Sequence, residues 1–196
     1  MSKKISSIFI IVLSALLLTG CGINNIPTYD EAVIAAWSQV QNQYKRRADL
    51  VPNLVNTVKG YAAHEQQVLT DVVEARSKVS QMQLPADVLS NPDAFRTFQQ
   101  NQDALSSALS RLMVVVERYP DLKANQNFLA LQSQLEGTEN RISVARRDYI
   151  TAVQTYNTEI RTIPGRWWKA LLYPESELKE NFTASPEVEQ VPEVSF

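Results

Sequence analysis

Few residues in this 196-residue chain have the types and spacing that catalysis or metal binding requires. His64 is the only histidine, and His64-Glu65 begins a pattern that zinc proteases complete with a second histidine four residues on, where this chain has Val68. The serines therefore have no other histidine to act as a base. Cys21 is the only cysteine, which excludes an internal disulfide and a cysteine-based metal cluster. We expect no enzyme activity, no catalytic residue, no metal site and no cofactor.

Cys21 occurs in the setting of a lipid-carrying cysteine. Two lysines precede an apolar run, Ile5 to Leu18, that is too short to span a membrane and is followed by small residues. Leu18-Thr19-Gly20-Cys21 matches the lipobox of bacterial lipoproteins. We expect residues 1–20 to be a signal peptide and Cys21 to carry lipid, which places the protein on a cell-envelope membrane, facing the periplasm or the exterior. Gly22 follows the cysteine, as in outer-membrane lipoproteins of Gram-negative cells, although the inner membrane stays an alternative.

The chain after Cys21 has the periodicity of helices. Apolar residues recur at steps of three and four along several stretches, among them Val33, Trp37, Val40 and Tyr44 in one and Leu105, Leu109 and Leu112 in another. No stretch alternates long enough to form a strand. The sequence predicts an all-α fold, an antiparallel up-and-down bundle of four long helices.

Capping residues and prolines set the predicted boundaries. Thr28 with Glu31 is typical of a helix start, and Asp49 with Pro52 predicts the start of a second helix. The four helices are predicted at residues 28–48, 49–79, 92–118 and 125–160. The alternative is that Pro52 only kinks one long helix, which leaves three antiparallel helices. The predicted organisation is a tether at 21–27, a bundle domain at 28–163 and a C-terminal extension at 164–196.

Three charged side chains lie on the apolar faces of the predicted helices, Glu65, Glu139 and Arg146, and Arg76 of the second helix is a candidate partner for them. A charge that is buried alone is strongly destabilising, so each needs a partner. We expect them to form an interior polar network that fixes the register of the helices. The alternative is a polar ligand or ion inside the bundle, which would make the protein a small-ligand binder or an enzyme.

Arg166-Trp167-Trp168-Lys169 follows the last predicted long helix. Tryptophan rings and long cationic side chains are both favourable at the headgroup level of a membrane. An even number of helices would return this segment to the end of the bundle where Cys21 is attached. We expect Arg166, Trp167, Trp168 and Lys169 to contact a membrane or a partner protein, unless the tryptophans only plug the bundle end. From Glu175 onward, glutamates and prolines predict a solvated acidic tail.

Several segments resemble the LemA family. They are Arg46-Arg47-Ala48-Asp49-Leu50-Val51-Pro52-Asn53-Leu54 and Glu117-Arg118-Tyr119-Pro120-Asp121-Leu122-Lys123-Ala124-Asn125, the stretch from Glu139 to Pro164, and the ending from Val191 to Phe196. Ile150 departs from the pattern, because the family usually has asparagine there. The resemblance implies a bundle of long antiparallel helices outside the cytoplasmic membrane or in the periplasm. It implies no reaction and no catalytic residue.

The charge balance limits the classes of partner. Lysine and arginine number 19 against 21 acidic residues, a net charge of −2, and no basic stripe with interleaved aromatics is present, so nucleic acid is not an expected partner. We expect a lipid-anchored scaffold or adaptor of the cell envelope. Its partners would be the membrane, through Cys21, and other envelope proteins. The sequence makes no prediction of an oligomeric state.

Overall fold

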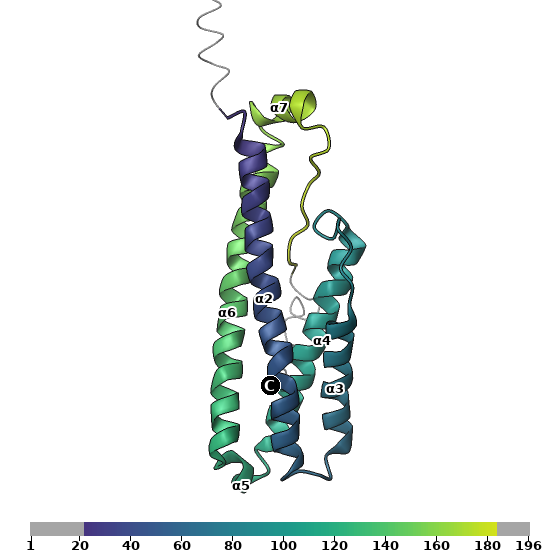
Figure 1. The fold of residues 1–196 in the computed structure, drawn as a ribbon, viewed down its shortest axis with the longest axis vertical. Coiled ribbons are helices and arrows are strands. Elements are labelled where there is room, and N and C mark those ends of the chain that lie inside the picture. The colour runs from purple at the N-terminus through teal and green to yellow at the C-terminus, as the bar shows by residue number, and fades with distance from the viewer. Residues whose placement is uncertain (1–21, 184–196) are drawn as a thin grey trace, which may run out of the picture.

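The computed structural model describes residues 22–183, and every regular element in that range is an α-helix (Figure 1). The long helices are α2 (Asn25–Lys59), α3 (Gln66–Gln81), α4 (Pro92–Val116) and α6 (Gln126–Glu159). Two short helices, α5 (Pro120–Lys123) and α7 (Gly165–Leu172), precede and follow α6. The predicted all-helical class is confirmed. The predicted signal peptide, Cys21 and residues 184–196 lie outside the described residues.

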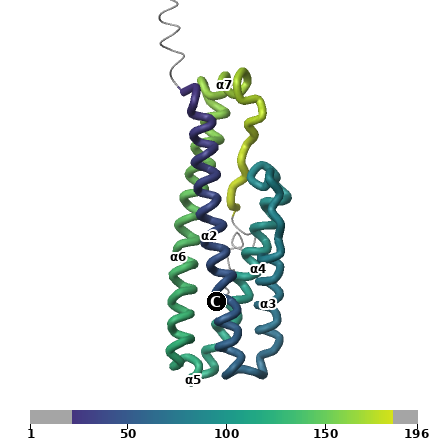
Figure 2. Tube along the Cα trace, viewed as in Figure 1, coloured from purple at the N-terminus to yellow at the C-terminus, as the bar shows by residue number. Residues whose placement is uncertain are grey.

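Consecutive long helices run in opposite directions (Figure 1). α2 and α6 lie side by side, and α3 contacts both α4 and α2. α2 and α6 extend beyond α3 and α4 at the end where α2 begins, and α7 lies across that end, whereas α5 lies at the opposite end (Figure 2). None of the helices within the described residues combines the length and the apolar composition of a membrane span.

The predicted helix break at Asp49 to Pro52 is wrong, because α2 runs through both residues. Proline normally interrupts a helix since it has no N–H for the carbonyl four residues earlier. That carbonyl belongs to Ala48, and it accepts a hydrogen bond from Nε of Arg76 on α3 at 2.9 Å. The chain turns instead at residues 60–65. The alternative of a single long helix through Pro52 is right that the helix continues past this residue, but wrong about its length, because α2 ends at Lys59 and α3 follows as a separate helix.

Side-chain caps place the starts of α4 and α6 where the sequence predicts them. The side-chain oxygen of Asn91 accepts a hydrogen bond from the amide of Ala94 at 3.1 Å, and that of Asn125 accepts one from the amide of Phe128 at 3.0 Å. Each bond satisfies an amide that has no partner within its helix.

The start of α2 differs from the prediction. The helix begins at Asn25, inside the segment 21–27 that the sequence assigns to a tether. Pro27 lies in the first turn, where its missing N–H leaves no helical bond unmade. Thr28 is therefore not the N-cap, and its hydroxyl donates to the carbonyl of Asn24 at 2.7 Å.

Two hydrophobic cores follow each other along the bundle. The lower core, toward α5, contains the predicted stripe of Leu105, Leu109 and Leu112, and each of these leucines is at most 4% exposed. The upper core, toward α7, contains a cluster of rings in mutual contact: Trp37, Phe95, Phe98, Tyr149 and Phe182. The burial predicted for the leucine stripe is confirmed.

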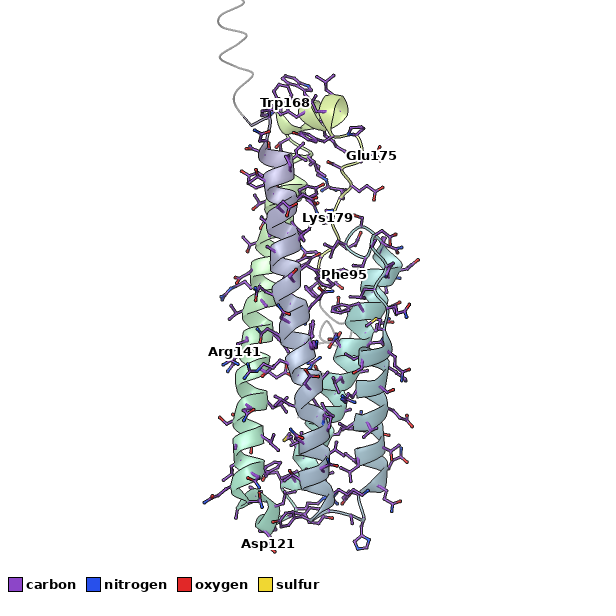
Figure 3. The ribbon with its side chains drawn as sticks, in the orientation of Figure 1. Phe95, Asp121, Arg141, Trp168, Glu175 and Lys179 are labelled. Atoms are coloured by element: carbon purple, nitrogen blue, oxygen red, sulfur yellow. The ribbon has the colours of Figure 1, made fainter. Side chains whose placement is uncertain are left out.

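Residues 173–183 form an extended segment, the strap, that packs along the bundle, as the position of Lys179 in Figure 3 shows. The amide side chain of Asn157 on α6 donates to the carbonyl of Lys179 and accepts from its N–H, both at 2.9 Å. Gln99 on α4 bonds the backbone of Thr183 in the same way, at 2.7 and 3.4 Å. The prediction of a solvated tail is therefore wrong for residues 175–183, because side chains of α4 and α6 form hydrogen bonds with the backbone of this segment.

Candidate functional site

Arg47 is the charged residue at the centre of the bundle, where it is 1% exposed. Its Nη1 donates to Oγ of Ser106 at 2.6 Å and to the carboxylate of Glu139 at 3.2 Å. Its Nη2 donates to the backbone and side-chain oxygens of Gln102 at 3.0 and 2.7 Å. Because the side chain of Glu139 is 43% exposed, the ion pair reaches solvent on one side. This Arg47 cluster joins α2, α4 and α6.

The predicted single network of Glu65, Arg76, Glu139 and Arg146 is wrong, because each of the four has a different partner. Glu65 lies in the turn before α3 and not on a helical face. Its Oε1 accepts hydrogen bonds from Nη2 of Arg118 at 2.8 Å and from the hydroxyl of Tyr119 at 3.1 Å. Since the turn occurs later than predicted, Glu65 closes the α5 end of the bundle.

Arg76 and Arg146 hold other segments in place. Arg76 bonds the carbonyl of Ala48 and so attaches α3 to α2. The guanidinium carbon of Arg146 lies 4.3 Å from the centre of the Phe182 ring, a cation–π contact that attaches the strap to α6. Glu139 is the only member of the predicted set that belongs to the Arg47 cluster.

Arg47 is the site residue that the sequence pattern failed to single out, although a signal for it exists. Continuing the apolar stripe of α2 beyond Tyr44 by alternating steps of three and four leads to Arg47, Val51 and Leu54, and all of these are buried. The helix break predicted at Asp49 ended that stripe too early.

Tyrosines of the upper core are held in their neutral form. Burial raises the pKa values of Tyr44, Tyr149 and Tyr156 above their ordinary value. The hydroxyl of Tyr149 donates to the carbonyl of Glu180 on the strap at 2.8 Å. This hydroxyl therefore acts as a fixed hydrogen-bond donor at neutral pH. Among residues 22–183, no three His, Cys, Asp or Glu side chains are placed to hold one metal ion.

The second candidate site is the end of the molecule where α2 begins (Figure 1). The amide of Asn25 bonds the carbonyl of Gly22 at 3.0 Å, and the Asn25 side chain donates to Oε1 of Glu159 at 3.1 Å. α7 starts so close to α6 that a Cβ on Gly165 would overlap the carbonyl of Glu159. Gly22, the residue after Cys21, therefore lies at the same end as α7.

α7 borders a hollow of about 760 Å³ at this end. Its lining contains three cationic side chains, an exposed indole and no acidic side chain. The lining residues are Ile160, Arg161, Ile163, Arg166, Trp167, Lys169, Ala170 and Pro174. Three of the predicted contact residues, Arg166, Trp167 and Lys169, line the hollow together.

The two neighbouring tryptophans occupy different environments. Trp168 is half-buried and packs against the upper core at the end of the bundle (Figure 3). Trp167 is 61% exposed, and Leu171, one turn further along α7, is 73% exposed. Trp168 therefore has the plugging position, and Trp167 is the one available for contact.

Long antiparallel helices, a buried arginine cluster and a short aromatic helix across one end define an all-helical bundle protein. A sequence model of the LemA family matches residues 36–196, most of the chain. The chain belongs to the LemA family.

Several curated relatives are similar to this chain. Magnetosome protein MamQ 2 of Paramagnetospirillum magneticum is 28% identical over 166 residues, which cover 76% of this chain and 60% of the relative. Protein LemA of Metamycoplasma hominis is 26% identical over 131 residues, 65% of this chain and 54% of the relative. The chain thus spans less than two thirds of the length of these relatives.

Proposed function

We propose that this protein is a lipid-anchored scaffold or adaptor of the cell envelope. In this proposal Cys21 attaches a helical rod to a membrane, and the sides of the rod bind other envelope proteins. The observation that supports it is the shared position of Gly22 and α7 at one end, with α5 at the other (Figure 1). A lipid on the preceding residue would leave the rod projecting from the membrane by roughly 50 Å, the length of a helix such as α2.

The interior of the bundle favours a scaffold over a ligand-binding or catalytic role. Both terminal nitrogens of Arg47 donate to acceptors on α4 and α6, whereas its buried Nε has no hydrogen-bond partner among the described residues. Such a cluster fixes the register of the rod. Three of the relatives are named for the magnetosome and not for a reaction, which fits a role in an assembly.

Membrane attachment is tested with Cys21→Ala in intact cells. The unchanged chain should enter the detergent phase on phase separation, whereas the variant should remain as precursor or appear as a soluble product. Val114→Ala, an exposed position on α4, is the control and should partition like the unchanged chain. Entry of the Cys21 variant into the detergent phase after removal of residues 1–20, to the same extent as the control, would refute the anchor.

The scaffold role is tested with a photo-crosslinking residue at exposed positions on the sides of the rod. Val73, Val114 and Val144 lie on α3, α4 and α6 and are 49%, 70% and 46% exposed. Crosslinks to other envelope proteins are expected from at least one of these helices. A buried position, Leu109, is the matched control and should give none. Absence of crosslinked protein from all three exposed positions would contradict the scaffold role.

A further inference from the structure

We propose that the α7 end of the rod docks onto an anionic phospholipid bilayer. The docking face consists of Arg161, Ile163, Arg166, Trp167, Lys169 and Leu171. This inference deepens the proposed function, since it names the surface on which the rod stands. The lipid on Cys21 would keep the protein at the membrane, and the docking face would orient it.

The apolar part of the docking face has no partner within the described residues. Trp167 and Leu171 lie one helical turn apart on the same side of α7, and Ile163 precedes them; their exposed fractions are 61%, 73% and 65%. The other side of α7 carries Trp168, which packs on the upper core. α7 is therefore a helix with one apolar side in the core and a second apolar side in solvent. Exposed apolar groups gathered in this way mark a contact surface.

The charged part of the docking face decides which surface fits. Arg161, Arg166 and Lys169 line the hollow beside Trp167, and no acidic residue lines it. This cationic cluster occurs in a chain whose net charge is −2. Tryptophan and cations together suit the headgroup layer of a membrane, where rings lie at the interface and cations meet lipid phosphates. An acidic protein surface would use the cations but would leave Trp167 and Leu171 uncovered.

The position of the docking face is also the one that a flat membrane requires. α7 lies across an end of the rod, and so it can meet a plane without contact from the long helices (Figure 2). Gly22 lies at this same end, next to Asn25. A lipid on the preceding residue and the docking face would therefore reach the same membrane surface.

Binding is measured with the chain expressed from Gly22, which contains every described contact and carries no lipid. Vesicles of phosphatidylcholine with phosphatidylglycerol are compared with vesicles of phosphatidylcholine alone by co-sedimentation. We expect binding to the anionic vesicles only, weakening as salt screens the charges. Brominated lipids should quench tryptophan emission, mostly that of Trp167, because Trp37 is 5% exposed and Trp168 faces the core.

Paired variants separate the two parts of the docking face. Arg166→Gln with Lys169→Gln should lower the partition coefficient roughly 25-fold, about fivefold for each cation. Arg141→Gln with Arg147→Gln, on the exposed side of α6, makes the same change in charge and should have little effect. Trp167→Ala with Leu171→Ala should lower the partition coefficient tenfold or more, on the order expected for two exposed apolar groups. Val114→Ala with Leu129→Ala is its control.

Each outcome decides the proposal. Equal binding to both kinds of vesicle, no binding to either, or α7 variants that fold and bind like their controls would overturn it. If the α7 substitutions leave vesicle binding unchanged and abolish a protein crosslink at this end, the docking face binds a protein partner instead of a membrane. None of these results changes the detergent partitioning of the lipidated chain, so failure of the docking face is distinguishable from failure of the anchor.

Discussion

Nε of Arg76 donates a 2.9 Å hydrogen bond to the carbonyl oxygen of Ala48, the group that Pro52 leaves without a donor inside α2. An unmade bond to a shielded carbonyl would destabilise the helix at this point. A side chain from α3 thus allows α2 to continue through a proline. The same bond attaches α3 to α2, so one contact contributes both to the continuity of one helix and to the position of the next.

We predict that Arg76→Met lowers the free energy of unfolding by about 1–3 kcal/mol, because it leaves the Ala48 carbonyl unsatisfied. In a Pro52→Ala background the loss should be smaller, since the new backbone N–H can bond that carbonyl. Urea denaturation followed by circular dichroism measures both values. Arg96→Met, at an exposed position on α4, is the control and should change stability by less than about 0.5 kcal/mol. Equal losses in the two Pro52 backgrounds would show that the contact does not substitute for the missing bond.

The sequence predicted the features that depend on neighbouring residues. The helical class follows from steps of three and four, and the helix starts predicted at residues 92 and 125 lie within one residue of the observed starts, where Asn91 and Asn125 each bond an amide three residues away. The continuity of α2 could not be predicted in this way, because the donor for Ala48 lies 28 residues further on. The sequence around Pro52 contains two local signs of a helix start, Asp49 as a capping residue and Pro52 in the first turn.

The strap was missed for a related reason. Its three glutamates and Pro174 give it the composition of a solvated tail. Its order depends on Asn157, 22 residues from Lys179, and on Gln99, 84 residues from Thr183. The Arg47 cluster likewise depends on partners 55 to 92 residues away. Such contacts form only when the helices pack, so no local pattern predicts them.

Loss of Glu139 and loss of Arg47 from their ion pair should lower the free energy of unfolding by different amounts. Glu139→Ala leaves a fully buried guanidinium without its counter-charge and should cost about 3 kcal/mol of unfolding free energy. Arg47→Met replaces the buried charge with an apolar side chain and leaves a carboxylate that already reaches solvent, so its cost should be smaller. The double variant should cost less than the sum of the two, measured by urea denaturation. Strict additivity would mean that the two side chains do not interact.

Leu109 lies in the lower core with 4% of its surface exposed. Leu109→Ala should lower the unfolding free energy by about 2–5 kcal/mol, because it removes buried methyl groups and leaves a cavity. Val114→Ala on the exposed side of the same helix should change it by less than about 0.5 kcal/mol. Thermal unfolding of both variants provides the comparison. Similar melting temperatures would mean that α4 does not bury the face assigned to it.

Phe182 attaches the strap to the upper core. Its ring centre lies 5.1 Å from that of Phe95 and 5.5 Å from that of Tyr149. Phe182→Ala should cost about 3 kcal/mol and expose the strap to proteases before the helices unfold. Limited proteolysis with mass spectrometry locates the first cut. Leu178→Ala, 39% exposed on the same strap, is the control and should be cut at the rate of the unchanged chain.

Alkaline pH should destabilise the bundle through Tyr149. Burial raises the pKa of this hydroxyl in the folded protein above its unfolded value of 10.0. Below that value both states hold the proton, and the stabilisation by the neutral hydroxyl is fully present. Above it the unfolded state loses the proton first and binds fewer protons, so the unfolding free energy falls as pH rises toward the folded pKa.

Tyr149→Phe isolates this effect. At neutral pH the variant should lose about 1 kcal/mol, because it lacks the hydrogen bond to the carbonyl of Glu180. Above pH 10 its stability should fall less steeply than that of the unchanged chain. The raised pKa values of Tyr44 and Tyr156 contribute to the slope in both proteins, so the difference between the two slopes reports Tyr149 alone. Parallel stability curves from neutral pH to pH 11 would mean that Tyr149 ionises as readily in the folded as in the unfolded chain, and its burial against the strap would then be wrong.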